Sequence, residues 1–339
     1  MDLPTLWFLI VGFLFVGYFV LDGFDFGVGM SLPFLGRDDV DRRVLINTIG
    51  PVWDLNETWL ITAGACLFAA FPLWYASLFS GFYLALLLIL LALIVRGVSF
   101  EYRHQGRSER WRRWFDAFIV IGSALPALLW GVAFADILGG TPVDADGDMH
   151  GGLLALLTPY GLLGGLTTLL VFLTHGAVFL SLRTEGDIRV RARRLAGRSG
   201  LLAILAAASF LLWTVLAHLD GEAAPVMVAA AVIAALAIVG GWVANLAGRE
   251  GLAFTGMAVA IAGTVGTLLA ALYPNVMVSS LDPAYSLTIA GASSSGYTLT
   301  VMSWVALVAL PVVLVYQGWT YWVFRRRIGR AHIESAGAH

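Results

Sequence analysis

The sequence predicts an all-α polytopic membrane protein with nine transmembrane helices. Of its 339 residues, 59% are hydrophobic and only 12% are charged, whereas a soluble globular chain is about 25% charged. The mean hydropathy is +0.85, and apolar stretches long enough to cross a bilayer recur along the chain. We expect helices because a backbone in lipid must satisfy its own hydrogen bonds, and the alternating segments of a β-barrel are absent.

The predicted spans follow one another in a single integral membrane domain that covers residues 1–339. They are residues 5–32, 45–70, 75–99, 115–138, 155–182, 197–219, 224–247, 252–273 and 298–323. We expect two four-helix units, a peripheral ninth helix and a cytoplasmic tail, at 1–140, 150–273, 298–323 and 324–339. A weak repeat supports the two units, since FVLDGFDF in the first span resembles FLTHGAVF in the fifth, although a match this short also arises by chance.

The arginines orient the predicted bundle. All twenty basic residues are Arg, and they follow the first, third, fifth, seventh and ninth spans. Intervening loops such as GGTPVDADGDMHGG contain none. By the positive-inside rule the N-terminus lies outside and the C-terminus lies in the cytoplasm. The long outer segment 274–297 is then either a flexible loop or a segment that folds back over the bundle.

Four acidic residues lie in the first two predicted spans: Asp22, Asp25, Asp54 and Glu57. A charge near the bilayer centre costs at least about 2.5–3.5 kcal/mol, so such residues usually have a function. Each pair is three residues apart and shares a helix face. At 1.5 Å per residue, Asp25 and Asp54 both lie roughly 10–15 Å from the inner surface and could face one another.

A proton path is the functional interpretation of these carboxyl groups, because a positioned carboxyl group can pass protons. It applies first to Asp25 and Asp54. The alternative is that the acidic residues cap broken helices, pair with an arginine across the bundle or, for Asp22 and Glu57, serve orientation and interface contacts. The nearby glycines and Pro51 make local unwinding of the helices plausible.

Other polar residues in the spans allow two interpretations each. Arg96 ends an apolar run, so it either extends to the inner surface or is the counter-charge of a buried carboxylate. His175 favours a hydrogen-bonded packing role over haem ligation, because no second His or CxxCH motif accompanies it. Gly23-x-x-x-Gly27 predicts close approach of another helix and marks the first span as a contact face for another chain. The single Cys66 excludes an intrachain disulfide, and no metal site is predicted.

Several motifs resemble subunit II of the cytochrome bd-type quinol oxidases. They are DGFDFGVGM, PVWDLNETWLITAGACLFAAFPLWYASLFSGFY, RGVSFEYR, IGSALPALLWGVAFADIL and SSSGYTLTVMSWVAL. The resemblance covers most of the chain in order, and it is most specific in the first hundred residues or so.

The resemblance implies a function that the residues alone do not give. The family's complex oxidises quinol and reduces dioxygen to water in the respiratory chain of the bacterial cytoplasmic membrane. Haem b and haem d are then ligated by a larger partner, subunit I, and this chain is a non-catalytic member of the heterodimer. The acidic channel positions of the family's WD-x-N and DGFD motifs fall on Asp54 and Asp25, and its arginine after the third span falls on Arg96. Glu57 occupies a position that is polar but not always acidic in the family.

Two other functions fit the same residues. A proton-coupled secondary transporter would also use buried carboxyl groups, although it would place them at the interface of two repeats. A purely structural assembly subunit would use them for interhelical contacts only. The expected partners are subunit I, membrane lipid and quinone, with a small accessory subunit as a further possibility. No nucleic-acid partner is expected, because the net charge of −2 provides no basic surface.

Overall fold

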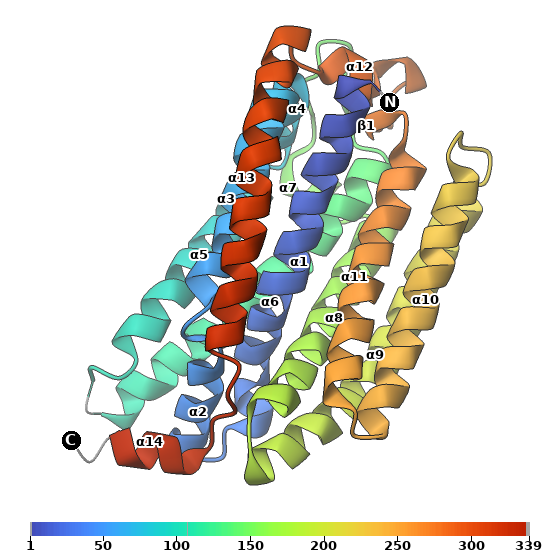
Figure 1. The fold of residues 1–339 in the computed structure, drawn as a ribbon. Helices are drawn as coiled ribbons and strands as arrows, with labels where there is room; N and C mark the ends of the chain where they lie inside the picture. The colour runs from blue at the N-terminus through green and yellow to red at the C-terminus, as the bar shows by residue number, and fades with distance from the viewer. Residues whose placement is uncertain (1, 107, 337–339) are drawn as a thin grey trace.

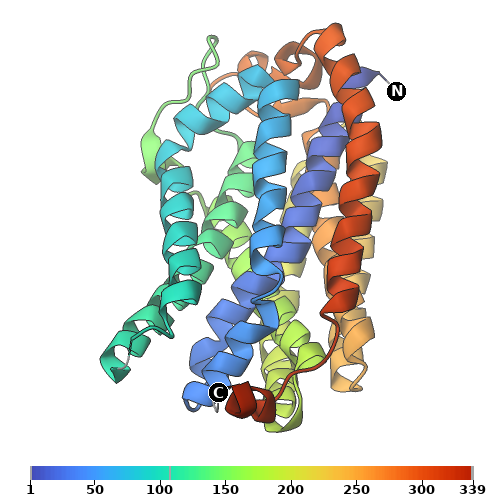
Figure 2. The ribbon, with the colours of Figure 1, turned by 60° about the vertical axis from the view of Figure 1, so that its left-hand side comes forward.

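The computed structural model describes residues 2–106 and 108–336, which form a bundle of long helices side by side (Figures 1 and 2). The helices are α1 (Leu3–Leu35), α2 (Asp39–Ile49), α3 (Trp53–Ala70), α4 (Pro72–Gly81), α5 (Tyr83–Tyr102), α6 (Glu109–Gly139), α7 (Gly152–Ala155), α8 (Pro159–Arg183), α9 (Gly186–Ala217), α10 (Ala224–Leu246), α11 (Glu250–Leu272), α12 (Ile289–Ala292), α13 (Gly296–Val323) and α14 (Arg330–Ala336). A short 3-10 helix, η1 (Pro283–Tyr285), and two strands, β1 (Asn275–Met277) and β2 (Leu287–Thr288), complete the described fold.

Eight helices in the described part of the chain are long and apolar enough to cross a membrane. They are α1, α5, α6, α8, α9, α10, α11 and α13. The all-helical prediction is confirmed, and each of these helices overlaps one predicted span. The second predicted span has its counterpart in α3, which has 18 residues and does not belong to this group.

Two predicted spans have different boundaries in the structure. Residues 45–70 do not form one helix, because α2 ends at Ile49 and α3 begins only at Trp53. Pro51 lies in this break, where its missing N–H and fixed φ disfavour a continuous helix. Residues 75–99 are likewise divided between α4 and α5, with Phe82 as the junction.

Helix α1 occupies the centre of the bundle. It packs against α3, α6, α8 and α11, and residues 22–32 are all buried. A Cβ added to Gly27 would lie 2.7 Å from the Cα of Gly176, so the backbones of α1 and α8 touch where they cross. The predicted close approach at Gly27 is therefore made within the chain. The prediction that this glycine face contacts another chain is wrong, because α8 already covers it.

The segment 274–297 folds back over the end of the bundle. Strands β1 and β2 pair antiparallel, and the backbone N–H of Val278 donates to the carbonyl of Ile137 at 3.0 Å. The backbone N–H of Ser294 donates to the carbonyl of Ala70 at 2.8 Å. Met277 is fully buried. Of the two alternatives for this segment, the structure has the folded one.

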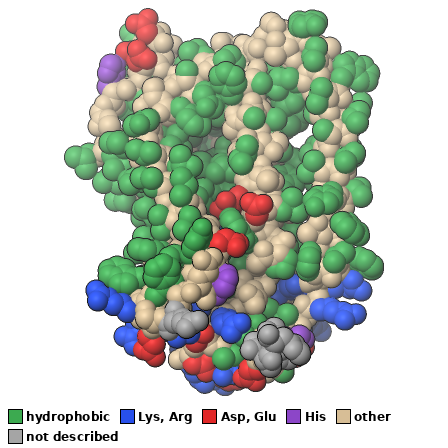
Figure 3. All heavy atoms as spheres, turned by 90° about the vertical axis from the view of Figure 1, so that its left-hand side faces the viewer, with side chains coloured by type: hydrophobic (Ala, Val, Ile, Leu, Met, Phe, Trp, Pro, Cys, Tyr) green, Lys and Arg blue, Asp and Glu red, His purple; other side chains and the backbone are tan. Residues whose placement is uncertain are grey.

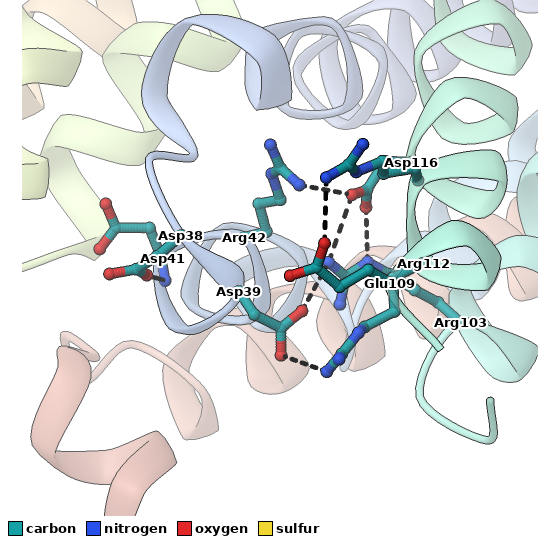
Figure 4. A network of polar contacts seen from close by, with 9 residues as sticks. Asp38, Asp39, Asp41, Arg42, Arg103, Glu109, Arg112 and Asp116 are labelled. Carbon is teal, nitrogen blue, oxygen red and sulfur yellow. Dashed lines mark hydrogen bonds and ion pairs between the residues drawn. The ribbon is translucent and has the colours of Figure 1, made fainter. Parts of the chain in front are cut away.

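The arginine-rich end of the bundle is held together by α2. The carboxylate of Asp116 on α6 accepts from Arg103 Nε at 2.5 Å and from Arg42 Nη1 at 3.0 Å. Asp39 pairs with Arg103 at 2.9 Å and with Arg112 at 3.4 Å (Figure 4). These contacts tie α2 to α6 and to the end of α5.

Helix α14 docks on α2 through Arg330. Its Nη1 donates to Asp38 Oδ2 at 2.8 Å and to Asp41 Oδ1 at 2.6 Å. The Asp41 carboxylate also pairs with Arg191 of α9 at 2.7 Å. The backbone N–H of Asp41 and the guanidinium of Arg330 lower the pKa of Asp38 below its ordinary value.

We expect acid to release α14. A carboxylate whose pKa is lowered by folding stabilises the docked state above its ordinary pKa of about 3.9, and this contribution is lost as the pH falls through the folded-state value. A seven-residue helix is not stable alone, so the hydrogen-exchange protection of residues 330–336 should fall between neutral pH and about pH 3. The variant Arg330→Gln should show the low protection at neutral pH. Equal protection factors at both pH values would contradict this coupling.

Candidate functional site

The buried charges of the bundle meet around Arg96 on α5. Its side chain is completely buried, and its Nη2 lies 2.8 Å from Asp22 Oδ1 and 2.5 Å from Glu57 Oε1. The guanidinium also lies over the ring of Phe26, 4.3 Å from its centroid. Arg96 is thus the counter-charge of two carboxylates from α1 and α3, and it does not extend to the surface. Of its two interpretations, the structure has the ion pair.

Asp25 belongs to a second, adjoining set of polar contacts. It is completely buried, and its Oδ2 accepts from Asn56 Nδ2 at 2.7 Å. The Asn56 Oδ1 in turn accepts from Gln317 Nε2 at 3.0 Å and from the Tyr321 hydroxyl at 2.8 Å. A hydrogen-bonded chain therefore links α1, α3 and α13 through uncharged side chains.

Several atoms of this site are buried and have no hydrogen-bond partner among the described residues. They are Asp22 Oδ2, Asp25 Oδ1, Arg96 Nε and Arg96 Nη1. Buried polar atoms in proteins are nearly always paired, and each unpaired one costs about 1–3 kcal/mol. The site also holds one guanidinium, that of Arg96, but three carboxyl groups: Asp22 and Glu57, which pair with it, and Asp25 in the adjoining set. The site therefore has both the acceptor atoms and the excess of acidic groups that holding a proton requires.

Asp54 lies apart from this cluster. It is exposed in the first turn of α3 and makes no hydrogen bond or ion pair within the part of the chain that the structure describes. The contact predicted between Asp25 and Asp54 is absent there, because Asn56 contacts Asp25 instead. Helix residues that are two positions apart in the sequence point about 200° away from each other around the helix axis. Asn56 therefore faces α1, while Asp54 faces away from it.

The side of the bundle next to α3 is an apolar surface with acidic side chains near the middle of its height. Figure 3 shows these acidic side chains among hydrophobic ones and above a band of arginines. Within α3, Asp54 is exposed and the Glu57 side chain keeps 21% of its surface accessible. Glu57 thus reaches Arg96 from the edge of the buried cluster, between the bundle interior and this face.

His175 occupies an aromatic packing position. It is completely buried, and its ring stacks on Phe254 with centroids 4.7 Å apart. Its Nε2 lies 3.1 Å from the carbonyl oxygen of Val20. Among the described residues, no group of three or more His, Cys, Asp or Glu side chains could hold a metal ion.

Sequence reasoning missed the uncharged members of the site. Asn56 lies within the motif WDLNETWL, and Gln317 and Tyr321 interrupt the apolar run of α13. Placing an amide or a phenol in a membrane span costs less free energy than placing a charge there, so these side chains are weaker indicators of a functional site. The available signal was the position of Asn56 between two acidic residues.

The chain is similar to proteins of one family over nearly its whole length. The family described as "Cytochrome bd terminal oxidase subunit II" matches residues 3–324. The chain is 42% identical to "Cytochrome bd ubiquinol oxidase subunit 2" of Bacillus subtilis (strain 168), covering 96% of this chain and 97% of the relative. It is 39% identical to "Cytochrome bd-I ubiquinol oxidase subunit 2" of Escherichia coli (strain K12), covering 98% and 97%.

A solved structure has the same fold. A chain from "The structure of bd oxidase from Geobacillus thermodenitrificans" superimposes with a TM-score of 0.75, covering 95% of this chain and 97% of the other. The two sequences are only 18% identical, so this match concerns the fold alone.

Proposed function

Because the chain belongs to the cytochrome bd terminal oxidase subunit II family, we propose that it packs against the haem-bearing subunit I and provides part of a proton-uptake path. It is a subunit of an oxidoreductase complex, and two of its relatives are named as subunits of ubiquinol oxidases. The observation that supports the proton path is the ion-paired cluster of Arg96 with Asp22 and Glu57, next to the buried Asp25, with acceptor oxygens of both aspartates left unpaired.

The proposed path runs from the arginine-rich surface to the buried cluster. Asp54 is the first carboxyl group of α3, next to the break at Pro51 and above the charged layer formed by α2. Glu57 follows one turn later on the same face and contacts Arg96. Asp22 and Asp25 lie deeper, and their unpaired oxygens can accept a proton or a hydrogen bond from water. Protons then pass to the oxygen-reducing site through groups of the partner.

The same residues indicate where subunit I docks. An exposed carboxylate such as Asp54 is costly against lipid, so a second protein that covers it removes that cost. Helix α13 contributes to the same side of the bundle (Figure 1), and only 6% of its most apolar stretch is buried within the chain. We therefore assign the face formed by α3, α5 and α13 to the contact with subunit I. This replaces the glycine face of the first span as the expected interface.

The proposed topology has nine crossings in the bacterial cytoplasmic membrane. The 18 residues of α3 span about 27 Å, close to the roughly 30 Å of a hydrocarbon core, so α3 is the additional crossing. The N-terminus is then outside, and the arginine-rich end with α14 faces the cytoplasm. The proposal keeps the predicted units, with four crossings in 1–140, four in 150–273, the ninth helix at 298–323 and the tail after it.

Haem b and haem d belong to subunit I in this proposal. The only buried histidine among the described residues, His175, does not fit an axial ligand, because its Nε2 lies against the carbonyl of Val20 and its ring stacks on Phe254. Quinol is the substrate of the complex. A bound quinone or a small accessory subunit would be additional components, to which we assign no residues.

The variant Asp54→Asn tests the proposed entry point. In the purified two-subunit complex, quinol-driven oxygen consumption should fall on the order of tenfold, because a positioned proton donor and acceptor is lost. The reduced-minus-oxidised haem spectrum should stay unchanged, since Asp54 contacts no other described residue that folding depends on. Asp148→Asn, which removes an exposed carboxylate at the opposite end, is the control and should keep full activity.

Two results would overturn parts of the proposal. Full oxygen consumption by a normally assembled Asp54→Asn complex would remove Asp54 from the path. A colourless, solitary protein obtained after gentle purification of the tagged chain would remove the partnership with a haem-bearing subunit.

A further inference from the structure

A basic pocket lies where α9 and α10 meet at the arginine-rich end of the bundle. It is open to the surface and has a cavity volume of about 420 Å³. Its lining includes Arg193, Arg194, Gly197, Arg198, Asn245 and Leu246. None of these residues belongs to the proton path or to the face assigned to subunit I.

The three arginines of this pocket lack carboxylate partners. Arg193 Nη2 makes only long contacts to the carbonyl oxygens of Asn245 and Leu246, at 3.5 and 3.4 Å. Its Nε is buried and has no hydrogen-bond partner among the described residues. Arg194 and Arg198 are exposed and form no ion pair within that part of the chain. The pocket therefore concentrates positive charge and unused donors.

Two other arginines of α9, unlike those of the pocket, are paired with carboxylates. Arg189 pairs with Glu250 at 2.7 Å, and Arg191 pairs with Asp41 at 2.7 Å. The surface of α9 thus has both paired and unpaired guanidinium groups within three helical turns. The unpaired ones are those that line the pocket. A guanidinium presents a planar fork of donors that matches a phosphate group better than it matches a single oxygen.

Exposed apolar side chains continue from this pocket along both helices. On α9, the positions three, four and seven residues beyond Arg198 are leucines. On α10, aliphatic residues precede Leu246 by three, seven and ten positions. These side chains, all exposed, are Leu201, Leu202, Leu205, Val243, Val239 and Leu236. The spacing places each set on one helix face. A basic pocket therefore opens at the end of an apolar surface that crosses the predicted hydrocarbon layer.

We propose that this pocket binds the phosphate group of an anionic phospholipid, with the acyl chains lying on the exposed aliphatic residues of α9 and α10. Phospholipid combines the two chemistries that the site presents, a phosphate anion and an apolar tail. Basic pockets between helices at the cytoplasmic side are suited to anionic headgroups. Arg194 and Arg198 bind the phosphate from the exposed side, and Arg193 closes the inner wall.

The test is native mass spectrometry of the purified two-subunit complex, titrated with dioleoyl-phosphatidylglycerol or dioleoyl-phosphatidylcholine. The pocket variant Arg194→Gln/Arg198→Gln should bind the anionic lipid on the order of tenfold more weakly than the natural complex. Binding of the zwitterionic lipid should not change between them. Arg193 is kept in this variant because it also contacts the end of α10.

The control removes equal charge elsewhere. Arg110 and Arg326 are exposed and form no ion pair with the described residues, so Arg110→Gln/Arg326→Gln should bind the anionic lipid as the natural complex does. Equal losses in both double variants would overturn the pocket in favour of general surface charge. Equal binding of the two lipids by the natural complex would also overturn it. Titration with inorganic phosphate alone is the last arm, and retained phosphate without retained lipid would overturn the assignment to phospholipid.

Discussion

Replacing Arg96 by methionine is expected to prevent accumulation of the assembled oxidase. Arg96 is the partner of Asp22 and Glu57 at 2.8 and 2.5 Å, and its removal leaves two carboxylates without a counter-charge inside the bundle. Removing one member of a buried ion pair typically costs about 3–5 kcal/mol, a large part of the total stability of roughly 5–15 kcal/mol that a domain has. The measurement is the amount of two-subunit complex in membranes, quantified by its haem absorbance.

The triple variant Arg96→Met/Asp22→Asn/Glu57→Gln separates charge from packing. It removes every formal charge of the triad at nearly constant volume, and replacing a complete buried ion-pair set is often neutral for stability. Assembly should therefore recover relative to Arg96→Met alone. Arg96→Lys should lie between the two, because a lysine keeps the charge, but its compact ammonium is more strongly hydrated than a guanidinium and is less suited to a buried ion pair. Poor assembly of the triple variant, equal to that of Arg96→Met, would show that the shape of Arg96 matters and its charge does not.

The long helices could be predicted because lipid imposes a simple length rule. Helices α1, α6, α8 and α13 are mostly apolar and each is longer than the roughly 20 residues that a crossing needs. The predicted span 45–70 ran through the break between α2 and α3, although Pro51 had made local unwinding plausible. What decides this break is a backbone constraint at one proline, together with the charged contacts that hold α2 at the end of the bundle.

The charged residues of the site could be predicted, but their pairing could not. A carboxylate or guanidinium in an apolar span is costly, so Asp22, Glu57 and Arg96 were identified from the sequence. Which carboxylate meets Arg96 depends on the rotation of α1, α3 and α5 about their axes. The break before α3 sets that rotation for α3, and it turned Asp54 outward and Asn56 inward. The contact between segments so far apart in the chain, such as Asn56 and Gln317, follows from helix packing alone.

Replacing Asp25 by asparagine is expected to lower quinol-driven oxygen consumption on the order of tenfold or more, with near-normal assembly. The asparagine keeps the volume and can still accept from Asn56 through its oxygen, but it cannot hold and release a proton. The rate of proton uptake from the lumen of proteoliposomes should fall in parallel with the rate of electron delivery, because forming water consumes protons and electrons in a fixed ratio. The haem spectrum reports whether the complex has assembled.

The variant Asn56→Ala distinguishes a proton carrier from a structural link. It removes the hydrogen bonds that join Asp25 to Gln317 and Tyr321 but keeps the Asp25 carboxyl group. If Asp25 transfers protons, the Asn56→Ala complex should consume oxygen several times faster than the Asp25→Asn complex. If the two residues only connect α1, α3 and α13, then Asn56→Ala should be the more damaging change, because it breaks the whole chain of contacts. That order of activities would place Asp25 outside the proton path.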